Sequence, residues 1–229
     1  MSEVEQIEEN LKKLKKLGVS ETEIIKRYES KILSLKNGEL SYVFIKNIKG
    51  ADVKAHGKAI IESKNLKWNY NFAKYVKGAD IKAHGKAVIE SKEPEWNCYF
   101  ANIEGADIKA HEKVVLESKE PEWNYKFAKN VKGADIKAHE KVVIESKEPE
   151  WNYYFARDVK GADVMAHGRV IIESKDSRVN DWFKKDFEDE YKFLKGNNLI
   201  DNAYNFIDDA LDKMIKENNE ENKSMQKRS

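Results

Sequence analysis

The chain has little cysteine, little proline and no long apolar segment. Its single cysteine, Cys98, excludes an internal disulfide and is typical of a reducing compartment. Three prolines in 229 residues, beside abundant lysine and glutamate, favour helices over strands. No apolar run approaches the roughly 20 residues that cross a bilayer, and the acidic start, Met1–Glu5, lacks the features of a signal peptide. These absences predict a soluble cytoplasmic protein with no membrane contact.

Net charge and catalytic motifs are also missing. The 42 Lys and Arg residues stand against 41 Asp and Glu residues, so the formal net charge is only +1. That balance excludes a global attraction to nucleic acid or anionic lipid. The sequence contains no nucleophile–base pair, phosphate-binding loop or cluster of metal ligands with competent spacing. We therefore predict no enzyme activity, no cofactor and no metal.

What the sequence does contain is a repeat. A Lys-Gly-Ala-Asp motif, or its Glu variant, recurs at spacings of 28, 27, 28 and 28 residues, at Gly50, Gly78, Gly105, Gly133 and Gly161. Each motif is followed by an Ala-His pair, with the histidines at His56, His84, His111, His139 and His167. Each is preceded by a large apolar residue, at Leu40, Trp68, Trp96, Trp123 and Trp151. The third copy is one residue shorter, so its first helix is expected to be short.

Each copy reads as two helices. In the fifth copy the first helix is predicted to start near Pro149, which suits the first helical position. Trp151, Phe155 and Val159 then form one apolar stripe. Gly161 favours the left-handed conformation that ends a helix. The residue two positions after this glycine is an aspartate in every copy, and it is predicted to cap the second helix.

A helical pair this short cannot bury its own apolar stripe, whereas stacked pairs share a continuous core. The sequence therefore predicts an all-α fold, an α-solenoid of stacked helical hairpins with atypical capping helices at both ends. Four regions are expected: N-terminal capping helices, the five-repeat solenoid, a degenerate repeat with C-terminal capping helices, and a disordered tail, over residues 1–36, 37–175, 176–216 and 217–229.

The motif Glu-Pro-Glu-Trp-Asn-Tyr, at 120–125 and 148–153, precedes Lys-Gly-Ala-Asp and Ala-His. This unit resembles repeats in uncharacterised proteins of low-GC bacteria and their phages. At fold level it is similar to the HEAT and tetratricopeptide solenoids, although each unit is shorter. The resemblance implies scaffolding and protein binding. It also suggests an adaptor or inhibitor, such as an anti-defence factor, that acts in the host cytoplasm on a protein or ribonucleoprotein complex.

Most repeated columns have a structural explanation. The tryptophans are spaced along the first helices as core residues are, and Cys98 is expected to be a thiol packed in the core. The histidines face inward, and neighbours about 8–10 Å apart could not share a metal ion. We therefore expect the histidine column to make buried hydrogen bonds between copies.

Basic residues recur at one position of successive copies, and we call them the basic column. If their charges line one face, they support a second hypothesis, nucleic-acid binding. The members of the column lie on the second helices, at Lys58, Lys86, Lys113, Lys141 and Arg169. A glutamate follows each of them by four residues, however, and this spacing predicts an ion-paired, solvated face.

Positions that differ between copies are released from the constraint of packing. On the first helices they lie at i,i+4 spacing on one outward face, and we expect a protein partner to dock there, at Tyr75, Tyr99, Lys126, Tyr154 and Asp158. On the second helices, mid-helix glycines at Gly57, Gly85 and Gly168 predict close approach by another backbone or a partner.

The sequence thus favours a non-enzymatic protein-binding solenoid. Nucleic-acid binding through the basic column is the first alternative. A self-assembling structural protein, a homo-oligomer in which incompletely capped ends stack on each other, is the second.

Overall fold

The structure is a computed structural model that describes the backbone of residues 1–226. Side chains at 198–203, 212 and 217–226, and residues 227–229 entirely, lie outside the description. Over the described backbone the regular elements are α-helices, with no strand, and they follow one another in tandem pairs. This confirms the predicted all-α repeat solenoid.

The chain divides into two compact units, Met1–Ser146 and Lys147–Ser229. The boundary falls inside the region 37–175 that the sequence predicts as one repeat domain, so that domain division stays a prediction. In the first unit, α1 (Glu3–Lys16) and α2 (Glu21–Ser34) precede four helical pairs. These pairs are α3 (Gly38–Asn47) and α4 (Val53–Glu62), α5 (Leu66–Tyr75) and α6 (Ile81–Ser91), α7 (Pro94–Phe100) and α8 (Ile108–Ser118), and α9 (Pro121–Asn130) and α10 (Ile136–Ser146).

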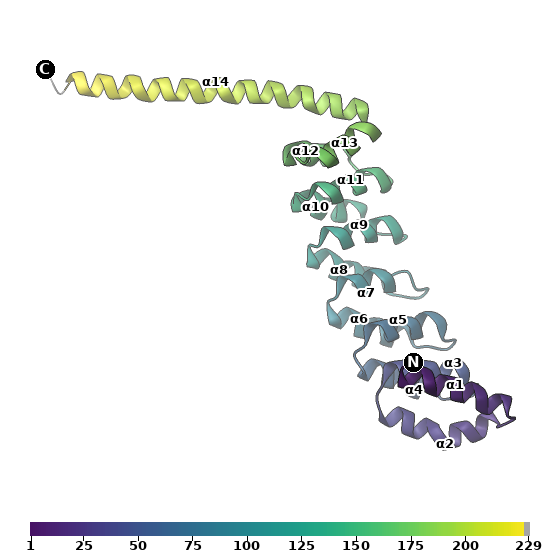
Figure 1. The fold of residues 1–229 in the computed structure, drawn as a ribbon. Coiled ribbons are helices and arrows are strands. Elements are labelled where there is room, and N and C mark those ends of the chain that lie inside the picture. Colours follow the sequence, from purple (N-terminus) through teal and green to yellow (C-terminus); the bar gives the residue numbers. More distant parts are fainter. Residues whose placement is uncertain (227–229) are drawn as a thin grey trace. The chain divides into compact units, whose positions relative to one another are not determined.

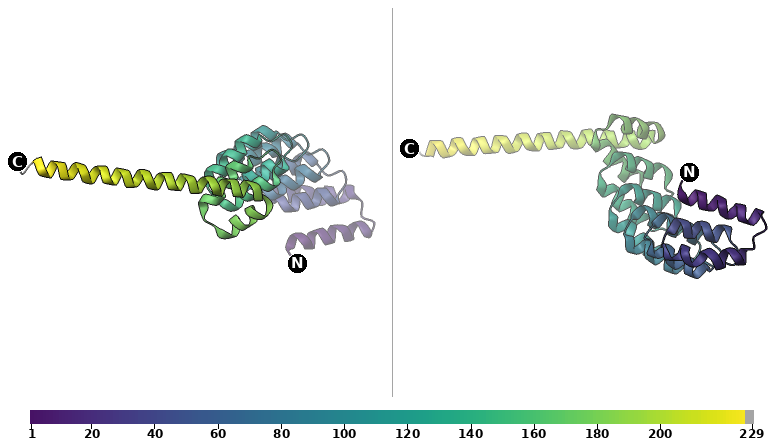
Figure 2. Two further views of the ribbon diagram at one scale, coloured as in Figure 1. Left: turned by 90° about the horizontal axis from the view of Figure 1, so that it is seen from above. Right: turned by 60° about the horizontal axis from the view of Figure 1, so that its bottom comes forward.

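Within this unit the helices form two rows. The first helices α3, α5, α7 and α9 contact one another in sequence, as do the second helices α4, α6, α8 and α10 (Figures 1 and 2). Between the rows lies a column of phenylalanines with no exposed surface, at Phe44, Phe72, Phe100 and Phe127. As the sequence predicts, α7 in the shortened third copy is the shortest of these helices, with 7 residues.

The repeated turn residues act as predicted. The glycine of each motif has φ between +84° and +86°, the left-handed region that suits a residue without Cβ. The aspartate side chains accept hydrogen bonds from the backbone N–H three residues on, as Asp80 does from Ala83 at 3.0 Å. The second helices end on lysines with positive φ, which no sequence signal predicts. These are Lys64, Lys92, Lys119, Lys147 and Lys175, with φ from 55° to 60°.

The N-terminal helices cap the first unit, and α2 imitates the second helix of a repeat. Its Glu29 carboxylate accepts the backbone N–H of Asp52 at 2.7 Å. In the same way Glu112, on α8, accepts the N–H of Asp135 at 2.5 Å. Both pairs are 23 residues apart, and Lys36 after α2 has the positive φ of the other helix-ending lysines. The cap is therefore a diverged copy rather than an unrelated pair.

The second unit contains α11 (Pro149–Asp158), α12 (Val164–Ser174), α13 (Ser177–Asp186) and α14 (Glu188–Gln226). Its core joins Tyr153, Ile171 and Phe183 to Leu194 at the start of α14. Beyond that turn α14 continues as one helix past α12 and α13 (Figure 1).

Over 217–226 the backbone continues helix α14, and the disordered tail expected at 217–229 stays a prediction. Three of the ten residues at 217–226 are glutamates, which favour helix, and three are asparagines, which favour it less. The remaining residues of the predicted tail, 227–229, lie outside the described residues.

Candidate functional site

The histidine column is buried inside the copies. His84 Nδ1 lies 2.9 Å from Asn69 Oδ1, and His111 Nδ1 lies 2.7 Å from Asn97 Oδ1, each pair within one copy. The Asn97 amide then donates to the Val88 carbonyl of the preceding copy at 3.1 Å. Asparagine therefore carries a hydrogen bond between copies, because the first helix lies between two successive second helices. Histidine also faces the preceding copy, since His139 Nε2 lies 3.5 Å from the Glu112 carboxylate.

Burial governs the chemistry of these imidazoles and of the thiol. It lowers the pKa of His84, His111 and His139 to about 4, so they are neutral at pH 7. Burial also raises the pKa of Cys98 to about 12, which leaves the thiol protonated and a poor nucleophile. Among the described residues no three His, Cys, Asp or Glu side chains form a group that could bind a metal ion.

The mid-helix glycines serve internal packing rather than an external partner. A Cβ on Gly57 would lie 3.2 Å from the ring of the next copy's phenylalanine, and a Cβ on Gly85 would lie 3.1 Å from the corresponding ring. At Gly168 the distance to the Phe183 ring would be 2.5 Å. The close approach predicted from the sequence is real, but it comes from the neighbouring copy.

The basic column on the second helices is exposed and ion-paired, as its spacing predicts. Each of four lysines lies 3.8–3.9 Å from the glutamate four residues on. The pairs are Lys58–Glu62, Lys86–Glu90, Lys113–Glu117 and Lys141–Glu145. Arg169, at the same position in the second unit, is also exposed. Because these lysines are paired with carboxylates, the face is less suited to binding the phosphates of a nucleic acid.

The first-helix row of the first unit carries a surface of aromatic rings that we call the first-helix strip. It comprises Tyr42, Trp68, Tyr70, Trp96, Tyr99 and Trp123. Ring centroids are 5.2 Å apart for Tyr42 and Trp68 and 5.8 Å apart for Tyr99 and Trp123. The tryptophans are half-buried, which differs from the predicted core position. The phenylalanine column already fills the space between the rows, so the indoles lie at its edge.

Two of the predicted partner-binding residues meet on this strip. Tyr99 is 39% exposed, and its ring packs edge-on against Trp123. The Lys126 ammonium lies 4.0 Å from the centre of the Trp123 ring and 2.5 Å from the Glu122 carboxylate. A cation over an indole beside an exposed tyrosine is a typical composition of a binding hot spot.

Tyr75, 61% exposed, is the most exposed tyrosine of the first unit. It lines a groove of about 530 Å³ between the ends of α3 and α5, together with Tyr42 and three lysines, Lys46, Lys49 and Lys77. The Lys74 ammonium also lies 5.3 Å from the Tyr75 ring. No contact connects Tyr75 to Tyr99 in the described part of the chain, so the structure places these two predicted residues in separate places.

The other two predicted residues lie in the second unit. Tyr154 is half-buried in an aromatic cluster with Trp151 and Tyr153, at centroid distances of 5.7 and 5.5 Å. The Arg157 guanidinium lies 5.1 Å from the Tyr154 ring and pairs with Asp158 at 2.7 Å. Asp158 is therefore neutralised by its neighbour, which reduces what it could offer an external cation.

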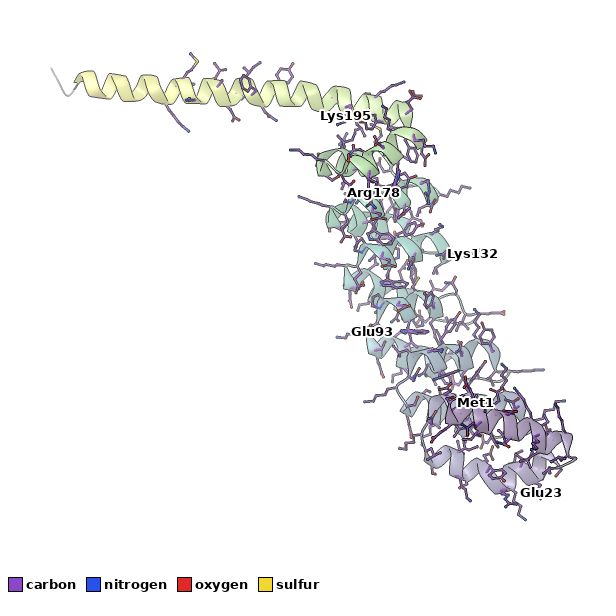
Figure 3. All side chains as sticks on the ribbon, viewed as in Figure 1. Met1, Glu23, Glu93, Lys132, Arg178 and Lys195 are labelled. Atoms are coloured by element: carbon purple, nitrogen blue, oxygen red, sulfur yellow. The ribbon has the colours of Figure 1, made fainter. Side chains whose placement is uncertain are left out.

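The sequence did not single out the tryptophans of the strip or the lysines of the groove as partner-binding residues, because residues of both kinds recur in most copies. Lys132, labelled in Figure 3, occupies the position in the fourth copy that Lys49 and Lys77 occupy in the first two. In the third copy that position is Glu104. The signal that could have identified the groove is this change of charge between copies.

Comparison of the chain with protein-family models, with curated proteins and with solved structures gives no match. Across the described residues, none of the helices combines the length and apolarity that crossing a membrane requires.

Proposed function

We propose that this chain binds another protein through the first-helix strip and has no catalytic activity of its own. In this proposal it is an adaptor or inhibitor that acts on a protein or ribonucleoprotein complex in the cytoplasm. The observation that carries the proposal is the strip itself, a row of half-buried or exposed rings outside a core that is already complete.

The composition of the strip supports a protein partner. Tyrosine and tryptophan are enriched at the centres of protein interfaces, whereas lysine is more common at their rims and on ordinary surfaces. Lys67 lies 5.1 Å from the Trp68 ring and Lys74 lies 5.0 Å from the Tyr70 ring, in addition to Lys126 over Trp123.

The test is site-specific photocrosslinking in a bacterial lysate. A photoreactive phenylalanine at position 99 should crosslink one prominent protein, whereas the same group at position 86 on the second-helix row should not. The pair Tyr99→Ala and Lys126→Glu should abolish capture of that protein. Equal crosslinking from both positions, or none from position 99, would contradict the proposal.

The nucleic-acid alternative has its own test. Binding of single- and double-stranded oligonucleotides should be titrated against salt, because phosphate contacts weaken steeply as salt rises. Affinity that Lys86→Ala and Lys113→Ala remove would favour the basic column instead.

A further inference from the structure

The groove between α3 and α5 differs in charge from the rest of the first-helix row. We call it the basic notch and define it by Tyr42, Lys46, Lys49, Tyr75 and Lys77. Its volume is about 530 Å³, and the remaining residues that line it are apolar side chains and Gly50. The notch therefore combines two phenol groups and three ammonium groups over an apolar floor.

None of the described residues that line the notch is acidic. The nearby carboxylates of the N-terminal cap are already engaged, since Glu8 pairs with Lys12 at 2.7 Å and Glu21 pairs with Lys15 at 2.8 Å. No carboxylate of the described chain lies within 4 Å of the three ammonium groups of the notch. Lys46 helps to lower the pKa of Glu8 and Lys49 helps to lower that of Glu21, so the positive charge of the notch is compensated in part, by carboxylates that also pair with lysines of the cap.

The other copies lack this combination. At the position of Lys77 the third copy has Glu104, and at the position of Tyr75 the fourth copy has Asn130 and the fifth has Asp158. Packing therefore does not demand a tyrosine or a lysine at these sites. Only the first pair of copies joins two repeat-turn lysines to an exposed tyrosine.

We propose that the basic notch binds an acidic segment of a protein partner, with carboxylates on the lysines and an apolar or aromatic side chain against Tyr42 and Tyr75. This inference rests on the proposed function and specifies the chemistry of the partner. The notch offers hydrogen-bond donors and cations but few acceptors, which is complementary to carboxylates.

A peptide suits the site better than a nucleic-acid strand. A strand that followed the first-helix row beyond the notch would meet carboxylates that repel phosphates, at Glu95 and Glu104, as well as lysines that already lie over aromatic rings, such as Lys74 and Lys126. A protein segment can place two or three carboxylates in one notch and continue along the row with uncharged side chains.

The experiment uses fluorescence anisotropy with the full chain and three probes. The first probe is a labelled dodecapeptide with four glutamates around one leucine and one phenylalanine. The second carries glutamine in place of each glutamate, and the third is a labelled dodecathymidylate. At low salt the acidic peptide should bind at least tenfold more tightly than its glutamine counterpart, and rising salt should weaken it.

The variant pair Tyr75→Asn and Lys77→Glu should weaken the acidic peptide about tenfold or more. Both replacements occur at equivalent positions of other copies, so they are compatible with the fold. Lys132→Glu makes the same charge change in the fourth copy and should alter affinity less than twofold.

The proposal would be overturned if the two peptides bound equally, or if neither bound. It would also be overturned if the variant pair and Lys132→Glu lost the same affinity for the acidic peptide. A third contrary result is that the oligonucleotide binds more tightly than the acidic peptide and that the variant pair abolishes this binding. Crosslinking from position 99 does not depend on the notch. Failure of this inference is therefore distinguishable from failure of the proposed function.

Discussion

At the scale of single residues, the first copy departs from the hydrogen-bond pattern of the others. It has Ser41 where the later copies have the asparagine that bonds histidine. The Ser41 hydroxyl and Nδ1 of His56 are buried without a hydrogen bond, whereas Nε2 of His56 lies 3.5 Å from the Glu29 carboxylate. Unsatisfied buried polar groups each cost about 1–3 kcal/mol. This copy is therefore less stable than its neighbours at one identifiable position.

We expect Ser41→Asn to stabilise the first unit by about 1 kcal/mol, because the new amide oxygen can accept from His56 as Asn69 accepts from His84. Urea unfolding followed by circular dichroism measures the change. The reverse replacement, Asn97→Ser, should cost about 1–3 kcal/mol by leaving His111 without its partner. A destabilising Ser41→Asn would show that the first copy lacks room for the amide.

At the scale of helices, the second helices end on lysines in the left-handed region. Lys92 and Lys119 have φ of 60° and 58°. A residue with a Cβ loses about 1–2 kcal/mol there, whereas glycine does not. Glycine is also more flexible in the unfolded chain, which offsets part of the gain.

Lys92→Gly and Lys119→Gly should therefore each raise the free energy of unfolding by about 0.5–1 kcal/mol. The matched control is Lys86→Gly, in the exposed middle of α6, which should cost about 1 kcal/mol. Thermal unfolding of the three variants decides the sign. Destabilisation by all three would mean that the lysine side chains at the helix ends make contacts that outweigh the backbone strain.

Among the described side chains of the longest helix, α14, the buried one lies near its start. With 39 residues and a rise of about 1.5 Å per residue, it is roughly 58 Å long. Leu194 is 5% exposed, whereas the large apolar side chains further along are 51–75% exposed. These are Tyr204, Phe206, Ile207, Leu211, Met214 and Ile215. The role of cap that the sequence predicts for residues 176–216 stays a prediction, and among the described side chains of α14 it is Leu194 that packs into the core of the second unit.

Leu194→Ala should destabilise the second unit by about 2–4 kcal/mol, because it leaves a cavity against Phe183 and α12. Leu211→Ala should change its stability by less than about 0.5 kcal/mol, because that side chain is 51% exposed. Differential scanning calorimetry compares the two variants. Equal losses would mean that the outer part of α14 is packed in solution.

At the scale of the whole molecule, buried neutral histidines link stability to pH. The pKa of His84, His111 and His139 is about 4 in the folded chain and about 6.5 when unfolded. The histidines therefore cost no stability above pH about 6.5, and stability falls as pH drops from 6.5 towards 4. Each should contribute a slope of about 1.4 kcal/mol per pH unit in that window.

Unfolding midpoints in urea at pH 7.5, 6.0 and 5.0 measure this dependence. His111→Gln should lower stability at pH 7.5 yet flatten the dependence, because one proton fewer is taken up on unfolding. A stability that is flat between pH 7.5 and 5.0 would show that the imidazoles are not held neutral by burial.

Much of the fold could be predicted because its signals are local. Each of these signals acts within one copy: glycine forms the turn, aspartate caps the backbone N–H three residues on, and proline starts a helix. The site was predictable in part, since Tyr75 and Tyr99 stand out as differences between copies. The tryptophans were misplaced because the spacing of Trp123 and Phe127 puts both on one stripe, and only packing decides which lies deeper.

By itself the sequence determined the repeat, the helical pairs and their caps, because these depend on backbone conformation within a few residues. Only the tertiary structure decided which residues meet between copies. It brought Tyr42 from one copy and Tyr75 from the next to the same notch, and it gave asparagine a hydrogen bond to the preceding copy. Such contacts depend on how neighbouring helices stack, and a linear pattern of spacings does not contain that information.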